Sequence, residues 1–339
     1  MKRVTMADVA ARAGVSKATV SYALNDRPGL ADSTRTRVLA AAEELGWTPN
    51  AAARVLSGAR TDTVGLVLNR PPSLVGIEPC YSSFLQGIEG ELSRHAVSLL
   101  MKVVQDHEHE LLTLRSWWSG GRVDGVVLID LRVGDDRPAL LAEAGIPVVG
   151  VGDPSMAGGM PTSWTDDAAS VHSVVSYLAA LGHRRIARVA DRGVLAHSTV
   201  RTAAFHAACA LAGVTETAVV EGGATPAEGA GVTRALLTRP DAPTAVVYDN
   251  TVTAMAGVAV AAEMGVDVPG RLSVVAWGDP AQCEYTHPTL SAVDHDAMDQ
   301  GARAVRMLLD LVAGSDPGDG CGGAPVFIPR GSTAPVRPA

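Results

Sequence analysis

Apolar and polar positions recur along this chain with two different patterns, and the change between them falls near residue 60. Before that point, apolar residues recur at helical spacing in short segments. From residue 63 onward, short and almost unbroken apolar runs are separated by longer amphipathic segments. The first part therefore predicts a small helical domain, and the second predicts a repeated strand–helix architecture.

The second part predicts an α/β fold with parallel sheets. The expected strands cover residues 64–68, 98–104, 124–130, 147–151, 186–190, 244–248 and 273–277. The expected helices cover residues 82–94, 106–118, 167–181, 199–212, 250–264 and 295–313. Because the strands are apolar throughout, helices should cover both faces of each sheet. The pattern starts afresh near residue 185, which indicates two similar lobes with a cleft at the carboxyl ends of their strands.

The first part predicts a helix, a tight bend and a second helix. Thr5 and Asp8 have the spacing of a capping box at a helix start, and Gly14 is suited to end that helix. Ser16 is placed to cap the next helix. This spacing is that of a helix-turn-helix, although a small helical bundle with an exposed polar face would give the same pattern.

A third helix is expected to begin at Asp32 or Ser33 and to end at Gly46. Its inward side should carry four apolar residues, namely Val38, Leu39, Ala42 and Leu45.

The second helix has few apolar residues, so most of its side chains should point outward. In a helix-turn-helix this helix enters the major groove, where its early residues meet base edges. Lys17 can donate to guanine, and Ala18 can contact a thymine methyl group. Ser21 and Asn25 can hold phosphates or bases.

The charge is unevenly distributed along the chain. Residues 1–60 contain nine Lys or Arg and five Asp or Glu, a net charge of +4. Of the 28 basic and 36 acidic residues in the chain, 19 and 31 remain for the other residues, a net charge of −12. A basic first domain on an acidic body indicates that the first domain meets a polyanion.

Cysteine spacing and hydropathy favour a cytoplasmic protein. The four cysteines are far apart and form no C-x-x-C pair, which predicts reduced thiols. No segment approaches the ~18 apolar residues of a membrane span. No apolar segment follows the first basic residues, which argues against a secretory signal.

Three stretches near the beginning of the chain follow the pattern of a known family. They read VTMADVAARAGVSKATVSYALN, TRTRVLAAAEELGWTPNAAARVLSG and TDTVGLVL. In this order they resemble the lactose/galactose repressor family of bacterial transcription factors. The resemblance implies a DNA-binding domain over residues 1–48 and a hinge helix and linker over 49–60. It also implies that Leu56 inserts between base pairs in the minor groove, where an apolar wedge kinks the duplex. Alternatively, Leu56 is a buried residue of an ordinary linker helix.

The motif and the resemblance together assign a set of DNA contacts. These are Thr5, Ser16, Lys17, Ala18, Thr19, Ser21, Tyr22, Asn25, Thr34, Arg35, Asn50, Ala53 and Leu56. Many relatives carry arginine where this chain has Tyr22. Tyrosine can reach a phosphate or stack on a sugar, but it cannot read guanine with two hydrogen bonds.

The resemblance continues to about residue 335 through VDGVVL, GIPVV, LGHRRIA, RTAAFHAACALAGV, GVDVPGRLSVVAW and PRGSTAP. It implies an effector-binding and dimerisation domain over 61–339 that resembles periplasmic sugar-binding proteins. The chain would cross between lobes near 162, 293 and 323. The first lobe would then comprise about 61–162 and 293–323, and the second about 163–292 and 324–339. The implied partners are operator DNA, a second copy of the chain and a small molecule, with a sugar as the first candidate.

Several residues are candidates for binding that small molecule. By resemblance, Arg201 is the effector-binding arginine, although a surface ion pair would also explain it. Asn250 and Asp166 match polar positions near the cleft, and each can instead cap a helix. Tyr81 and Phe84 can form an apolar or stacking wall or belong to the core.

One position in the cleft departs from the family. Relatives usually have an aspartate where Gly278 stands, and that carboxylate grips a sugar hydroxyl. Asp279 is adjacent and can replace it only with a different side-chain direction, while Trp277 can provide a stacking face. A non-sugar effector therefore stays open.

The sequence favours a regulator over an enzyme. It contains no G-x-S-x-G, H-E-x-x-H or phosphate-binding glycine loop, and no cofactor is expected. His107 and His109 lie two residues apart and would diverge on a helix, so no metal site is expected. The alternative function is a cytoplasmic sugar-binding module without DNA-binding activity.

Overall fold

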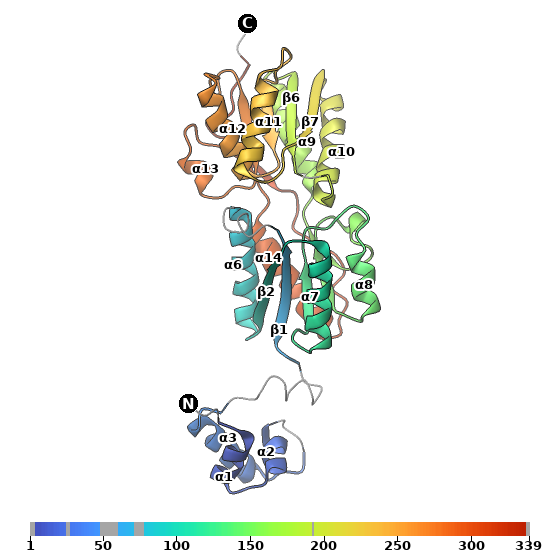
Figure 1. Cartoon of the computed structure of the whole chain (residues 1–339), viewed down its shortest axis with the longest axis vertical. Helices are drawn as coiled ribbons and strands as arrows, with labels where there is room; N and C mark the ends of the chain where they lie inside the picture. Colours follow the sequence, from blue (N-terminus) through green and yellow to red (C-terminus); the bar gives the residue numbers. More distant parts are fainter. Residues whose placement is uncertain (1–3, 25–27, 48–59, 71–77, 192, 337–339) are drawn as a thin grey trace. The chain divides into compact units, whose positions relative to one another are not determined.

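The computed structural model describes residues 4–24, 28–47, 60–70, 78–191 and 193–336. The chain divides into two compact units, Met1–Thr61 and Asp62–Ala339. Figure 1 shows both units and labels most of their helices and some of their strands.

The first unit contains three helices: α1 (Met6–Ala13), α2 (Lys17–Leu24) and α3 (Asp32–Glu44). The Asp8 carboxylate accepts hydrogen bonds from the backbone nitrogen and the hydroxyl group of Thr5, at 2.8 and 2.6 Å. Gly14 ends α1 in the left-handed conformation, with φ of 66°. Ser16 Oγ then accepts a hydrogen bond from the backbone nitrogen of Thr19 at 3.1 Å, which caps α2 as expected.

Small side chains form the core between these helices. The buried residues are Val9, Ala10, Ala13, Val20, Ala23, Val38, Ala41 and Ala42. The expectation that Leu39 points inward is wrong, because Leu39 is 47% exposed. Val38, Ala41, Ala42 and Leu45 recur at helical spacing, and that stripe leaves Leu39 on the outer side.

The second unit is built on two six-stranded sheets. The first sheet has the order β11-β5-β4-β3-β1-β2, and all its strands are parallel. Its strands are β1 (Thr63–Asn69), β2 (Ser98–Val104), β3 (Gly125–Leu128), β4 (Val148–Val151), β5 (Thr162–Trp164) and β11 (Gly320–Cys321). Its helices are α6 (Pro79–Arg94), α7 (His107–Ser119), α8 (Arg137–Glu143), η1 (Pro154–Met156) and α14 (Ala297–Val312).

The second sheet has the order β12-β10-β9-β8-β6-β7. Its strands are β6 (Arg185–Ala190), β7 (Glu216–Glu221), β8 (Ala245–Tyr248), β9 (Ser273–Trp277), β10 (Ser291–Asp294) and β12 (Val326–Ile328). Its helices are α9 (Asp167–Ala180), α10 (Ala196–Leu211), α11 (Pro226–Leu237), α12 (Thr251–Glu263) and α13 (Gln282–Tyr285). Only the edge strand β12 runs antiparallel among the described strands.

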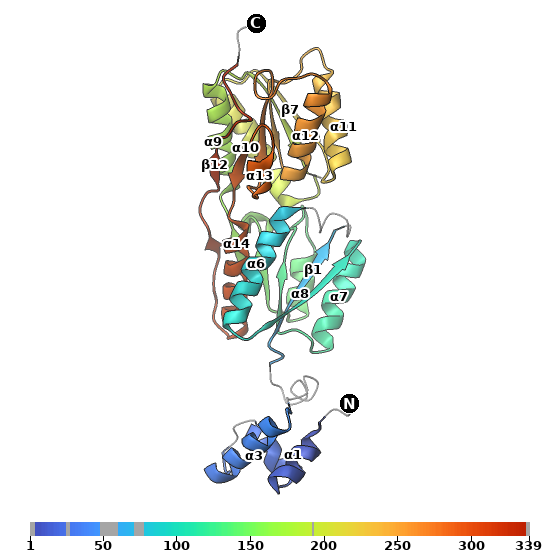
Figure 2. The same cartoon turned by 90° about the vertical axis from the view of Figure 1, so that its left-hand side faces the viewer.

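Helices cover both faces of each sheet, as the apolar strands predict (Figures 1 and 2). In the first lobe α6 and α14 cover one face while α7 and α8 cover the other. In the second lobe α9 and α10 lie opposite α11 and α12. The predicted fold class, two α/β lobes with parallel sheets, is confirmed.

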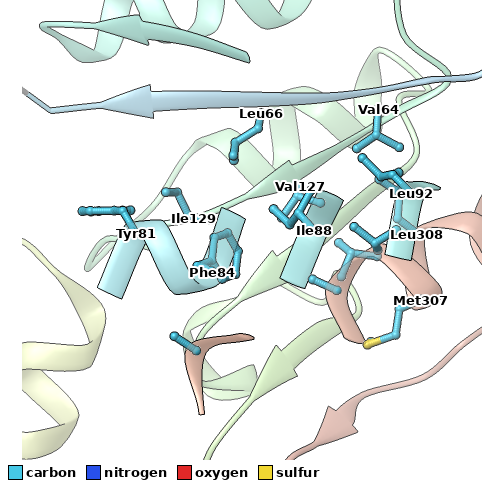
Figure 3. Close-up of a cluster of buried hydrophobic side chains, with 14 of the residues drawn as sticks. Val64, Leu66, Tyr81, Phe84, Ile88, Leu92, Val127, Ile129, Met307 and Leu308 are labelled. Carbon is cyan, nitrogen blue, oxygen red and sulfur yellow. The ribbon is translucent and has the colours of Figure 1, made fainter. Parts of the chain in front are cut away.

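Three segments connect the lobes. The first runs from β5 to α9, the second from β10 to α14, and the third from β11 to β12. The second brings α14 back to the first lobe, where it packs against α6. Figure 3 shows side chains of α6 and α14 meeting those of β1 and β3 in a shared core.

Two glycines allow the close approach of α6 and α14. A Cβ atom at Gly87 would collide with the carbonyl oxygen of Met298, and one at Gly301 would collide with that of Phe84. The first lobe is thus closed by a helix from the far end of the chain, and this places the start of α14 beside the cleft.

Candidate functional site

Most side chains on the outer face of α2 are exposed within the described part of the first unit. Lys17 and Ala18 are exposed, and the large ring of Tyr22 is 46% exposed. Ser21 is half-buried beside them. Val20 and Ala23 point the other way, into the core. Two of the four outward residues, Lys17 and Ala18, stand at the start of α2, where a recognition helix meets bases.

Other predicted DNA-contacting residues also have structural partners. Ser16 and Thr19 share the cap of α2, with 2.9 Å between their hydroxyl oxygens. Arg35 Nη1 donates to the carbonyl oxygen of Ala23 at 3.2 Å and so ties α3 to the end of α2. Thr34 is half-buried in the first turn of α3. Asn25, Asn50, Ala53 and Leu56 lie outside the described residues, so their assignments stay predictions.

A cavity of about 190 Å³ lies between the two lobes of the second unit. It is placed at the carboxyl ends of the strands, where ligands of open α/β sheets bind. Each of several strands is followed within two residues by a polar side chain on the cavity wall. These side chains are Arg70 after β1, Asp130 after β3, Asp153 after β4, Asp191 after β6, and Asp249 and Asn250 after β8.

Arg201 and Trp277 form the wall from the second lobe. Arg201 is almost fully buried, and its guanidinium carbon lies 4.1 Å from the centre of the Trp277 ring. Its Nε donates to Asp167 Oδ2 at 2.7 Å, while its terminal nitrogens donate to none of the described residues. These terminal nitrogens are therefore available to a ligand. A flat cation stacked on an indole is held in one orientation.

Two further nitrogens of this wall lack partners in the described structure. They are Trp277 Nε1 and His295 Nδ1, both buried. Burial lowers the pKa of His295, and so does the charge of Arg201, which keeps that imidazole neutral. Because a buried polar atom without a hydrogen bond is unfavourable, this wall favours a ligand with hydrogen-bonding groups.

Asn250 lines the cavity and also caps a helix. Its side-chain oxygen accepts from the backbone nitrogen of Thr253 at 2.8 Å, at the start of α12. The neighbouring Asp249 is buried and paired with Arg188, and it also accepts from the backbone nitrogen of Asp191 at 3.0 Å. Burial opposes ionisation of Asp249, but Arg188 is the main charge that lowers its pKa. Asn250 therefore caps α12 and lies on the cavity wall, and its contact with an effector stays a prediction.

The wall from the first lobe centres on Asp130. Arg70 donates to both its carboxylate oxygens at 3.0 and 3.1 Å, and the Tyr81 hydroxyl donates at 3.1 Å. Burial would raise the pKa of Asp130, yet Arg70 lowers it to about 2. Arg70 Nη1 also lies 3.8 Å from Asp191 of the other lobe, so this guanidinium spans the cleft. Phe84 adds an apolar surface on the same side.

A buried ionic network fixes the backbone at Asp130. That residue has φ of 51°, a conformation that is strained for any residue other than glycine. Arg137 Nη2 donates to its carbonyl oxygen at 2.8 Å. Arg137 in turn pairs with Glu110 and Asp135, and all three side chains are about 1% exposed. The network therefore positions a cavity carboxylate that it does not itself touch.

The two lobes also meet through their backbones next to the cavity. The Val133 nitrogen donates to the Val194 oxygen at 3.0 Å, and the Ala196 nitrogen donates to the Leu131 oxygen at 2.8 Å. Together with Arg70 and Asp191, these bonds hold the lobes against each other on one side of the cleft.

Two predicted effector residues do not line the cavity. Asp166 caps α9 and accepts from the backbone nitrogen of Ala169 at 2.9 Å, while the next residue, Asp167, reaches the cavity. Asp279 is paired with both terminal nitrogens of Arg330, at 2.6 and 2.7 Å. The Asp279 carboxylate is therefore engaged by Arg330 and does not lie on the cavity wall.

Sequence reasoning missed several residues of this site, namely Arg70, Asp130, Asp153, Asp167, Asp191, His197 and His295. A usable signal was present, because most of them follow a strand at its carboxyl end. Among the described residues no group of His, Cys, Asp and Glu is arranged to hold a metal ion. His107 and His109 bind separate partners, Asp136 and Asp106. No described helix is both long enough and apolar enough to span a membrane.

Glu78 is a cavity residue whose ionisation is unfavourable. Burial raises the pKa of Glu78 from 4.5 to about 7, Asp130 and Asp191 raise it further, and Arg70 opposes them. A carboxyl group with a raised pKa stabilises the fold below its ordinary pKa, and this contribution is lost as the pH rises through about 7. We therefore expect the free energy of unfolding of Glu78→Gln, measured relative to that of the wild type, to increase from pH 5 to pH 8. The increase should be on the order of 3 kcal/mol.

Urea unfolding of both proteins at the two pH values measures this difference. Glu89→Gln is the control, because Glu89 is an exposed carboxylate on α6, the helix that Glu78 directly precedes. An equal difference between Glu78→Gln and wild type at pH 5 and pH 8 would contradict the raised pKa.

Known protein families match parts of both units of the chain. Residues 5–50 match the family described as bacterial regulatory proteins, lacI family, and residues 175–333 match a periplasmic binding protein-like domain. The transcriptional regulator CelR of Thermobifida fusca is 32% identical over 318 residues, which cover 92% of this chain and 93% of CelR.

Two solved structures have a similar fold. A LacI family regulator from Bifidobacterium animalis subsp. lactis has a TM-score of 0.76 and 34% identity, covering 82% of this chain and all of that one. A CelR–cellobiose complex has a TM-score of 0.72 and 28% identity, covering 97% of this chain and all of that one.

A helix-turn-helix domain joined to a two-lobed body with a cavity defines a DNA-binding transcriptional regulator. The chain belongs to the lacI family of bacterial regulatory proteins. The resemblance read from its sequence is thereby confirmed.

Proposed function

We propose that this regulator is a cytoplasmic homodimer that represses transcription at an operator and is released or recruited by a sugar or related metabolite. The observation that carries the proposal is the cavity itself, which takes polar side chains from both lobes and a stacked Arg201–Trp277 pair. Paired carboxylates and guanidinium groups beside an aromatic face suit the hydroxyl groups and the apolar ring faces of a sugar. The complex of the related CelR contains cellobiose.

The effector contacts that we propose are Tyr81, Phe84, Arg201, Asn250 and Trp277. Arg201 is the main clamp, because its terminal nitrogens are available and its orientation is fixed by Asp167 and Trp277. The chemistry is binding and no catalytic role is assigned. A sugar-binding module without DNA-binding activity does not explain the exposed face of α2 or the family match over residues 5–50.

A ligand screen tests the proposed effector. Sugars, polyols and nucleosides are each added to the purified protein, and its thermal unfolding is followed. Binding to the folded state raises the unfolding temperature in proportion to ligand saturation. Any stabilising compound is then tested for its effect on operator affinity. A chain that no compound of these classes stabilises would contradict the proposed effector class.

In the first unit, we expect Lys17→Ala to reduce sequence discrimination. Lys17 is exposed at the start of α2, where a side chain reaches base edges, and one such contact discriminates by ~1–3 kcal/mol. The loss should therefore be about 5- to 150-fold on the selected operator and small on a scrambled duplex. Arg35→Ala is the comparison, because Arg35 holds α3 to α2 and should weaken binding to both duplexes alike. Fluorescence anisotropy titrations measure all four affinities, and an equal loss on both duplexes for Lys17→Ala would remove it from base reading.

A further inference from the structure

Glu78 is a charged residue of the cavity wall that the proposed function does not use. It lies directly before α6, its side chain faces the cavity, and it is only 6% exposed. No described residue forms a hydrogen bond or an ion pair with its carboxylate. Residues 71–77, which precede it in the chain, contain no lysine, arginine or histidine.

Arg70, the positively charged residue that acts on Glu78, already pairs with other carboxylates. Arg70 donates to both oxygens of Asp130, and its remaining terminal nitrogen lies 3.8 Å from Asp191. The Tyr81 hydroxyl also donates to Asp130 and not to Glu78. In this part of the cavity, three carboxyl groups therefore face one guanidinium among the described residues.

Burying a carboxylate without a counter-ion is costly, and a cation in the adjacent space offsets part of that cost. The charged groups that act on Glu78 are Arg70, Asp130 and Asp191, and two of the three disfavour its ionised form. A bound cation would reverse that balance. At the opposite wall, Arg201, Trp277 Nε1 and His295 Nδ1 present nitrogens suited to the oxygen atoms of a ligand.

We propose that the effector carries a protonated amino group, that this group binds the Glu78 carboxylate, and that the rest of the ligand is a sugar-like framework held by Arg201 and Trp277. The effector class is therefore an amino sugar or a similarly sized polyhydroxylated amine. This inference rests on the proposed function, because it assumes that the cavity is the effector site.

Matched ligands separate the charge from the framework. D-glucosamine, D-galactosamine and D-mannosamine are each compared by calorimetry at pH 7 with the parent hexose and with the N-acetylated form, on the full chain. A charged hydrogen bond in a buried site should make at least one amine bind ~10-fold or more tightly than both its neutral partners. At pH 6 that binding should release protons, because Glu78 is protonated in the empty cavity and ionised in the complex.

The variant Glu78→Gln should reduce the affinity of the amine to that of its parent hexose and abolish proton release. Glu89→Gln, on the exposed side of α6, should change neither. An amine advantage that survives Glu78→Gln would overturn the proposal, and so would equal or tighter binding of the neutral partners in every pair. If cellobiose or another neutral sugar binds more tightly and alters operator affinity, this inference falls and the proposed function stands. If an amine binds as expected but leaves operator affinity unchanged, the inference stands and the proposed function falls.

Discussion

Arg201→Ala is expected to leave operator binding close to that of the wild type and to abolish the influence of the effector on it. An effector changes DNA affinity only if it binds the DNA-competent and DNA-incompetent forms with different affinities. Arg201 belongs to the second lobe and faces a cavity that both lobes build, so a ligand held by it senses their relative arrangement. The wild type should show a ~5–150-fold effect of saturating ligand, and the variant less than about twofold.

Operator titrations with and without ligand measure both proteins. Arg234→Ala is the matched control, because Arg234 is an exposed arginine of the same lobe and pairs with Glu263 at the surface. Arg201→Lys keeps the positive charge beside Asp167 but loses the planar guanidinium group with its several N–H donors. This variant should retain only part of the effector's influence on operator affinity. A variant Arg201→Ala that responds as fully as the wild type would show that Arg201 is not the effector clamp.

Arg137→Met is expected to cost about 3–5 kcal/mol of the free energy of unfolding of the second unit, because it removes the buried cation that pairs with two buried carboxylates. Glu110 and Asp135 both pair with Arg137, and the three side chains are almost completely inaccessible. The change also removes the bond to the Asp130 carbonyl oxygen, so the cavity carboxylate loses its fixed backbone.

Urea unfolding, followed by tryptophan fluorescence, gives the loss of stability. Arg234→Met is the control, since an exposed ion pair contributes only ~0–1 kcal/mol. A second measurement separates positioning from folding, because under conditions where the variant is folded its ligand affinity should still be reduced. A loss below about 1 kcal/mol, or an unchanged ligand affinity, would contradict the role given to this network.

The sequence predicted the architecture well because its signals are long and regular. Buried parallel strands are apolar throughout, and the helices between them are amphipathic, so most of both lobes could be assigned. Apart from the six-residue β7, the missed strands and helices are short or weakly patterned. Helix α8 has seven residues, and β5, β11 and β12 have two or three, which is too short for a period to show.

Helix α11 was missed although it carries a recognisable start. Thr225 and Glu228 form a capping box, and Pro226 stands at the first helical position. Two alanines and two glycines early in that helix hide its apolar stripe. β12 pairs antiparallel with β10 because the chain comes back from the first lobe in that direction. The local sequence of β12 does not indicate this direction.

The site was predicted where a side chain's position follows from the end of a strand or the first turn of a helix. Asn250 and Trp277 reach the cavity in this way, whereas Arg201, in the second turn of α10, was assigned by its resemblance to a family position. Asp166 caps a helix, whereas the adjacent Asp167 reaches the cavity. The spacing of residues in the sequence cannot distinguish these two neighbouring positions. Asp279 was assigned by adjacency to Gly278, but its direction is set by Arg330, which is 51 residues away along the chain.

The central claim is that occupancy of the cavity and binding of the operator are coupled in one molecule. Coupling between two sites is reciprocal, so the operator must change ligand affinity by the same factor by which the ligand changes operator affinity. The most direct measurement is therefore the dissociation constant of a ligand from the screen, determined by calorimetry on the full chain with and without a saturating operator duplex. A shift of ~5–150-fold that matches the ligand's effect on operator affinity is the predicted result. The same ligand dissociation constant in the presence and absence of operator would contradict the account.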